Sequence, residues 1–278
     1  MTEPQQEQQK FKVSIVYLLP ILASIIFGLG CAAILMTPQA QVIPVAPFPE
    51  DQASGPFSNA LYFVVLVGIS ATVFYFLLKR KSVKIIKVMI AFAMTTASLL
   101  LSLIYLQAIS ITVPALEALI IPLTIIITIL FDLAIFKFVK ARNAAVVCLG
   151  GALGVFFGAA IPWLSAVLIL AFLAVYDVFA VYRGPVGKIA QTGLDQLSGL
   201  SFSFKDIQMG LGDLVFYSML TGMILFNFGF LACAVSIAGI MAGSILTFFM
   251  LEKKGIFPGL PFPIMFGLAG GLIIAFLI

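Results

Sequence analysis

Histidine is absent from this 278-residue sequence, and charged side chains are scarce. Without histidine the chain cannot build the HExxH site of zinc proteases, a Ser–His dyad or any histidine-ligated metal centre. Carboxylates, hydroxyls, lysines and thiols remain for acid–base or nucleophilic chemistry. The sequence predicts neither a metal site nor an organic cofactor.

The shortage of charged residues also predicts that the chain is surrounded by lipid rather than water. Charged residues make up 9% of the chain and hydrophobic residues 63%, whereas soluble domains carry about 25% charged residues. Such a chain cannot cover a globular surface with polar groups, and its apolar runs of about 20 residues are typical of membrane spans. The sequence therefore predicts an integral, multi-pass protein whose partner is the lipid bilayer. It gives no reason to expect a nucleic-acid partner, and it leaves homo-oligomerisation open.

The apolar runs predict an all-α membrane protein with nine transmembrane helices. The polar residues before the first run lack the short apolar region and cleavage site of a removable signal, so the first span is expected to be retained. The expected spans are 13–36, 57–78, 84–107, 113–137, 143–160, 162–183, 209–228, 231–250 and 257–278.

Basic residues orient these spans. Every lysine and arginine falls on one side of the membrane when the N-terminus is cytoplasmic, and the opposite loops contain none. Because positive charge is concentrated in cytoplasmic loops, the N-terminus is predicted to be cytoplasmic and the C-terminus extracytoplasmic. The basic positions are Lys10, Lys12, Lys79, Arg80, Lys81, Lys84, Lys87, Lys137, Lys140, Arg142, Arg183, Lys188, Lys205, Lys253 and Lys254.

Two longer connections interrupt the series of spans. Residues 37–56 are proline-rich and predict an extended or irregular loop on the outer face. Residues 184–208 mix glycine, serine and charge, which predicts a mobile cytoplasmic linker. This linker separates an N-terminal six-helix part, 1–183, from a C-terminal three-helix part, 209–278.

Four acids lie within or near the predicted spans. Glu117 is about one turn from the outer end of its span and can reach the interface. Asp132 lies five positions before Lys137, which predicts an ion pair at the inner end of the same span. The other two, Asp177 and Asp213, have no lysine or arginine within their helical segments. Because ionisable groups inside a membrane are costly, these two acids are the candidate functional residues.

Asp177 and Asp213 are predicted to lie at the same depth. Asp177 is six residues before Arg183, which corresponds to about 9 Å of helix, and Asp213 is four residues after Met209, about 6 Å. The two spans run in opposite directions, so both carboxyl groups are expected in the cytoplasmic third of the membrane. Neighbouring spans can place them face to face.

Paired carboxyl groups in a low-dielectric setting share one proton, because they cannot both ionise readily. Aspartic proteases use such a pair: the ionised member takes a proton from the attacking water, and the protonated member donates to the peptide carbonyl oxygen. The same pair also suits a proton-coupled transporter or channel, or a structural contact that shares a proton. From the carboxyl groups alone, all three alternatives remain open.

The residues next to these acids carry further information. Gly210 and Gly212 remove side chains beside Asp213, which permits either close helix packing or the approach of a peptide backbone. Tyr176 precedes Asp177 and can supply a hydroxyl group at the same level.

Three short motifs occur together at defined positions in the series of spans. They are Tyr176-Asp177 in the sixth span, Gly210-Leu211-Gly212-Asp213 in the seventh, and Pro258-Gly259-Leu260 at the start of the ninth. Together they resemble the Tyr-Asp, Gly-x-Gly-Asp and Pro-Ala-Leu motifs of the presenilin and signal peptide peptidase family of intramembrane aspartyl proteases. The continuation DLVFYSML and the cytoplasmic N-terminus are most similar to presenilins, here in the form of a microbial homologue.

The resemblance implies an intramembrane aspartic endopeptidase with Asp177 and Asp213 as its catalytic pair. It further implies active-site support from Tyr176, Gly210, Leu211 and Gly212, and a substrate-binding role for Pro258, Gly259 and Leu260. Two features depart from the family pattern. Gly259 replaces alanine, and the 184–208 linker is much shorter than in presenilins, so autoproteolysis there is not expected.

The implied substrates are single-span transmembrane proteins or peptides, cut near their cytoplasmic end. A helix hides its carbonyl groups in internal hydrogen bonds, so the substrate must unwind locally. An exposed strand, in the 184–208 linker or at the start of the last span, is expected to hold the extended peptide by main-chain pairing. The rival hypotheses are a prepilin-peptidase-like protease, whose zinc-binding cysteine region is lacking here, a proton-coupled carrier or channel, and a protease-like scaffold without activity.

Overall fold

Apolar helices form most of the part of the chain that the computed structural model describes, residues 13–37, 42–50, 52, 54–183, 201–204 and 207–277. Within it, seven helices are long and apolar enough to cross a membrane, and an eighth is shorter. The chain is therefore an integral, multi-pass membrane protein. The helices are α1 (Leu19–Leu35), α2 (Gly55–Lys79), α3 (Val83–Thr112), α4 (Ile120–Asp132), α5 (Val139–Ala160), α6 (Trp163–Tyr182), α8 (Leu211–Lys254) and α9 (Pro261–Leu277).

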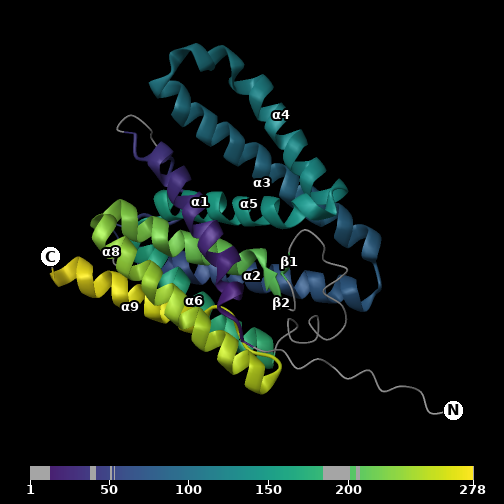
Figure 1. Cartoon of the computed structure of the whole chain (residues 1–278), viewed down its shortest axis with the longest axis vertical. Coiled ribbons are helices and arrows are strands. Elements are labelled where there is room, and N and C mark those ends of the chain that lie inside the picture. Colours follow the sequence, from purple (N-terminus) through teal and green to yellow (C-terminus); the bar gives the residue numbers. More distant parts are fainter. Residues whose placement is uncertain are drawn as a thin grey trace.

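Helix α8 forms the centre of the molecule, where it packs against α5, α9 and α1 (Figure 1). Helix α2 packs mainly against α6, and α3 packs mainly against α4. The α3–α4 pair extends away from the α8–α9 part. The predicted span at 113–137 is interrupted rather than a single α-helix, since a 3₁₀ turn (Pro114–Leu119) precedes α4 and a π turn (Leu133–Lys137) follows it.

Glycines on one face of α5 allow its backbone to touch α8. A Cβ atom added to Gly154 would lie 2.3 Å from the Val215 carbonyl oxygen, and one added to Gly158 would lie 2.6 Å from the Met223 nitrogen. Small residues at helix contacts permit such close approach in membrane proteins. This contact fixes the first half of α8 against α5.

Helix α8 reverses its direction at Gly229. This residue has φ 85° and ψ −178°, a backbone conformation that glycine adopts readily. The Cys233 thiol hydrogen-bonds to the Thr221 carbonyl oxygen at 3.5 Å although the two residues are 12 positions apart, a separation of about 18 Å in a straight helix. The segments 211–228 and 230–254 therefore fold back on each other, and the turn predicted near residue 229 is confirmed.

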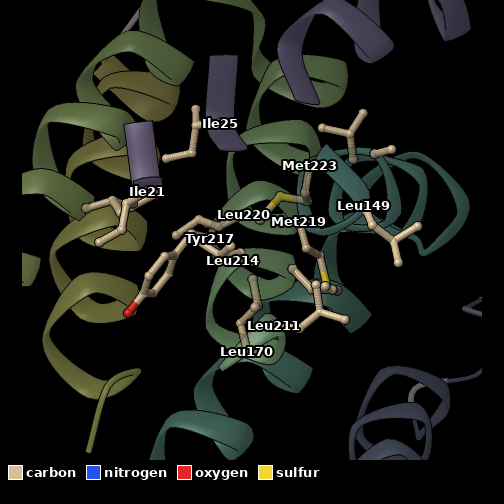
Figure 2. Packing of buried hydrophobic residues seen from close by; sticks show 14 of the residues in the cluster. Ile21, Ile25, Leu149, Leu170, Leu211, Leu214, Tyr217, Met219, Leu220 and Met223 are labelled. Carbon is tan, nitrogen blue, oxygen red and sulfur yellow. The ribbon is translucent and has the colours of Figure 1, made fainter. Parts of the chain in front are cut away.

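The buried core surrounds the first half of α8. Figure 2 shows Leu214, Tyr217 and Leu220 of α8 beside Ile21 and Ile25 of α1. All five side chains are at most 4% exposed. Tyr217 is the one polar side chain among them, and its hydroxyl points out of the apolar cluster.

Part of the linker that was predicted to be mobile forms a β-hairpin, in one of the two places where an exposed strand was expected. Strands β1 (Ser201–Phe204) and β2 (Ile207–Gly210) pair antiparallel, with Ser201 opposite Gly210 and Phe204 opposite Ile207. Strand β2 runs directly into α8, so the Gly-Leu-Gly-Asp motif stands at a strand-to-helix junction. The remainder of the linker, residues 184–200 and 205–206, lies outside the described residues.

Asp132 does not form the ion pair predicted with Lys137. Its Oδ2 atom instead accepts a hydrogen bond from the Thr95 hydroxyl of α3 at 2.8 Å. Its Oδ1 atom is buried without a hydrogen-bond partner in the described part of the chain. The nearby hydroxyl on the packed helix α3 was not visible from the spacing of Asp132 and Lys137 along one span.

Candidate active site

Asp177 lies near the C-terminal end of α6 and faces the chain segment that leads into α9. Helix α6 begins after Pro162 and contains neither glycine nor proline, so it carries Asp177 on an uninterrupted helix. The Leu260 backbone N–H donates a hydrogen bond to Asp177 Oδ2 at 3.0 Å. The backbone of Gly259 also interacts with this carboxyl group.

Asp213 occupies the first turn of α8, directly after β2. The positive end of the helix dipole favours an acidic side chain there. Its carboxyl group packs against Gly259: a Cβ atom added to Gly259 would lie 2.9 Å from Asp213 Oδ2 and 3.0 Å from Oδ1. Glycine at this position therefore leaves room for the carboxyl group, which a larger residue would displace.

The Pro258–Leu260 segment brings the two acids to one place. Leu260 binds Asp177, and Gly259 touches Asp213, although the acids come from different helices. The two carboxyl groups lie close enough to interact electrostatically. Both are partly buried, whereas Pro258 and Leu260 are buried. The structure thus juxtaposes the Asp177, Asp213 and Pro-Gly-Leu motifs.

Tyr217 is a further residue of this site that the motif comparison did not identify. Its hydroxyl donates a hydrogen bond to the Gly259 carbonyl oxygen at 2.9 Å, and its side chain is 2% exposed. Tyr217 follows Asp213 by four positions, so both lie on the same face of α8. A polar residue at that spacing within an apolar span was the signal that could have identified it.

The other predicted support residues have different surroundings. A Cβ atom on Gly210 would lie 3.9 Å from Asp213 Oδ2, so its backbone borders the carboxyl group. Gly212 is exposed, and a Cβ atom there would meet only Phe216, at 3.8 Å.

The Leu211 side chain is buried beside Gly150 of α5, and Tyr176 lies beside Gly68 of α2. The predicted roles of these four residues remain predictions.

The arrangement has the groups that general acid–base chemistry requires. Two carboxyl groups converge on the Gly259–Leu260 backbone, and neither α6 nor the segment 211–228 contains a lysine or arginine to neutralise them. Such a pair favours the state that holds a single proton, in which one group can accept a proton while the other donates one. The Pro258–Leu260 backbone lies at the same place and forms one side of the candidate site.

Comparison with known proteins finds similarity at the level of fold. No protein-family model and no curated sequence matches this chain. Two solved structures of a presenilin family intramembrane aspartate protease do match. The C222 crystal form has a TM-score of 0.68 and 19% identity, covering 96% of this chain and 100% of that one. The P2 form has a TM-score of 0.66 and 19% identity, covering 97% and 100%. The resemblance to presenilins therefore extends to the fold of nearly the whole chain.

Proposed function

We propose that this protein is an intramembrane aspartic endopeptidase that hydrolyses peptide bonds of transmembrane substrates. The observation that carries the proposal is the convergence of Asp177 and Asp213 on the Pro258–Leu260 segment. The fold shared with presenilin family intramembrane aspartate proteases supports it. No cofactor enters the reaction.

The proposed reaction uses the two carboxyl groups in opposite protonation states. The ionised aspartate removes a proton from a water molecule, whose oxygen attacks the scissile carbonyl carbon. The protonated aspartate donates its proton to the carbonyl oxygen, which gives a gem-diol. The two aspartates have now exchanged protonation states: the newly protonated one donates to the amine nitrogen, the newly ionised one accepts a proton from a gem-diol hydroxyl, and the C–N bond breaks. Water supplies the nucleophile, so no covalent enzyme intermediate forms.

The substrate is a single-span protein or peptide that unwinds beside the acids. Strand β2 ends at Gly210, three residues before Asp213, so an extended substrate paired with the hairpin would pass close to the dyad. Val175 and Phe179 are 71% and 56% exposed, but each lies two positions from Asp177, so they form an apolar face on the opposite side of α6. The substrate therefore approaches Asp177 from the side of the Pro258–Leu260 segment.

The proposed topology has nine spans, a cytoplasmic N-terminus and an extracytoplasmic C-terminus. The reversal at Gly229 supports counting 211–228 and 230–254 as two spans. The basic turn between α2 and α3, with Lys79, Arg80 and Lys81 exposed, is then cytoplasmic, as the positive-inside rule requires.

Reconstitution with a single-span substrate tests the function. The parent protein is expected to release two fragments detectable by mass spectrometry, while Asp177→Asn and Asp213→Asn each abolish cleavage, since either change removes one member of the pair. Glu117→Gln, an exposed acid on α4's preceding turn, is the matched control and should cleave normally. Persistent cleavage in either aspartate variant would reject the shared mechanism. Ion or solute flux in liposomes, without proteolysis, would favour the transporter hypothesis instead.

A further inference from the structure

The loop that precedes α2 is tied to three helices, although its proline-rich sequence predicted an irregular segment. The Val45 N–H donates to the Ala160 carbonyl oxygen at the end of α5, at 3.0 Å. Phe48 is bound by Asn59 of α2, and Glu50 is bound by Ser165 of α6. We call Phe48, Glu50, Asn59 and Ser165 the clasp. In the proposed topology the clasp lies at the extracytoplasmic face, opposite the acids.

Asn59 is the buried centre of the clasp. Its Oδ1 atom accepts from the Phe48 N–H at 2.9 Å, and its Nδ2 atom donates to the Phe48 carbonyl oxygen at 2.8 Å. The same Nδ2 donates to the Ser165 hydroxyl oxygen at 3.0 Å. Asn59 and Ser165 are both 0% exposed. Because buried polar groups are strongly destabilising when unpaired, this network holds the loop, α2 and α6 in one arrangement.

Glu50 supplies the cap that α6 lacks in its own sequence. The residue before the helix is Pro162, which provides no side-chain cap, so the first N–H groups of α6 need partners from elsewhere. Glu50 Oε1 accepts from the Ser165 N–H at 3.0 Å and from the Ser165 hydroxyl at 2.9 Å. An acidic group at a helix N-terminus is also stabilised by the helix dipole.

The clasp holds the well-packed half of α6, while Asp177 lies on the other half. In the first half, Ser165, Ile169 and Leu170 are at most 1% exposed. In the second half, Val175, Phe179 and Tyr182 are 71%, 56% and 51% exposed. Asp177 follows Ser165 by 12 residues, about 18 Å along the axis. With no glycine or proline between them, a shift or rotation at Ser165 is transmitted to Asp177.

We propose that Glu50 and Asn59 are positioning residues for Asp177, which they hold in place through the rigid helix α6. This inference rests on the proposed protease function. The clasp fixes the axial position and rotation of α6. The Asp177 carboxyl group is thereby held within hydrogen-bond distance of the Leu260 N–H. Glu50 and Asn59 touch neither the substrate nor the reacting atoms.

Steady-state kinetics of Glu50 variants test the proposal. Glu50→Ala is expected to lower kcat about tenfold, because small displacements of a reacting group reduce the rate strongly. KM should stay within about twofold, since the Pro258–Leu260 segment and β2 are unaltered. Glu50→Gln keeps an oxygen acceptor for Ser165 and should lose less than about threefold. Glu117→Ala removes an exposed acid elsewhere and should match the parent.

A distance measurement separates this proposal from the proposed function. Spin labels at Phe179→Cys of α6 and Lys253→Cys of α8, both exposed positions, report the inner ends of the two helices in a background without the native cysteines. Glu50→Ala should broaden or shift their distance distribution, while Glu117→Ala should not. Unchanged kcat with an unchanged distribution would overturn the inference even if Asp177→Asn abolishes cleavage. If Asp177→Asn still cleaves, the proposed function fails, and the distance distributions alone test the link between Glu50 and Asp177. If Glu50→Ala does not fold, Glu50→Asp, whose shorter side chain draws the carboxylate away from Ser165, replaces it in both measurements.

Discussion

At the scale of single residues, Gly259 explains how two acids share one site. The Asp213 carboxyl group lies where a Cβ atom of residue 259 would point, the Gly259 carbonyl oxygen accepts a hydrogen bond from Tyr217, and the neighbouring Leu260 N–H donates to Asp177. The family pattern has alanine where this chain has glycine. Here the space for a methyl group is already occupied by the Asp213 carboxyl group, so the glycine and the position of Asp213 are matched to each other.

Gly259→Ala is therefore expected to impair cleavage although alanine is the residue of the family pattern. The added Cβ atom would stand 2.9 Å from Asp213 Oδ2, so the carboxyl group must move, and we expect kcat to fall about tenfold for a displacement of this kind. Gly30→Ala on α1 is the matched control, because nothing lies within 4 Å of its Cβ position. Full activity of Gly259→Ala would contradict the prediction, because it would show that the Asp213 carboxyl group can move away from residue 259 without loss of catalysis.

Tyr217→Phe isolates the hydroxyl that holds Gly259. The ring and its core packing remain, but the Gly259 carbonyl oxygen loses the 2.9 Å hydrogen bond. We expect a loss of about 1 kcal/mol in the free energy of unfolding and a several-fold fall in kcat, because the segment between the acids becomes less constrained. Tyr62→Phe, at an exposed tyrosine of α2, is the control for thermal unfolding and kinetics. Equal behaviour of the two variants would contradict a role for Tyr217 in the site.

At the scale of helices, the site depends on how closely α5 approaches α8. Gly154 and Gly158 of α5 leave no Cβ atom between the two backbones at these positions, which lets the first half of α8 lie directly against α5. Because Asp213 lies in the first turn of α8, this contact helps to set the depth of the carboxyl group. Apolar membrane helices cannot gain such specificity from hydrophobic burial alone, since lipid is equally apolar.

Gly154→Val is expected to break this contact. Its Cβ atom would overlap the Val215 carbonyl oxygen at 2.3 Å, which is backbone and cannot rotate away, so we expect destabilisation by about 2 kcal/mol or more. Thermal unfolding in detergent measures the change. The same substitution at Gly30, which faces open space, supplies the comparison. A melting temperature as high as that of Gly30→Val would contradict the direct backbone contact.

At the scale of the whole molecule, the arrangement of the spans decides which ends of the helices meet. Asp177 is near the end of α6, and Asp213 is near the start of α8. Their meeting requires α6 and the first half of α8 to run in opposite directions across the membrane. The second half of α8 must then return to the same side, so that the Pro258–Leu260 segment can reach both acids.

Cysteine labelling tests this topology. In a background without native cysteines, Ser54→Cys before α2 and Phe230→Cys at the α8 reversal should react with a membrane-impermeant maleimide added outside. Ser82→Cys between α2 and α3 should react only after the membrane is opened. Ser54 and Ser82 are matched, because each precedes a helix without capping it through its side chain. Labelling of Phe230→Cys only from inside would contradict the two-span interpretation of α8.

Contacts between residues on different helices could not be predicted from patterns along the sequence. The hydropathy and motifs predicted the helices, the turn near residue 229 and the two acids at a common depth. The spacing of Tyr217 from Asp213 could have placed it on the same face of the helix, but not its role, which depends on the Gly259 carbonyl oxygen 42 residues away. The predicted partner of Asp132 was wrong for a similar reason: Thr95 lies on another helix, 37 residues away.

By itself the sequence determined that this protein is an integral membrane protein built of apolar helices, and that two carboxyl groups lie in helical segments without lysine or arginine. These properties follow from local composition, because hydration and helix length act on each segment separately. Only the tertiary structure decided that Gly259 and Leu260 lie between those carboxyl groups and that Glu50 caps the helix carrying one of them. Such contacts depend on which backbones can approach each other in three dimensions, and no periodicity along a single segment encodes that.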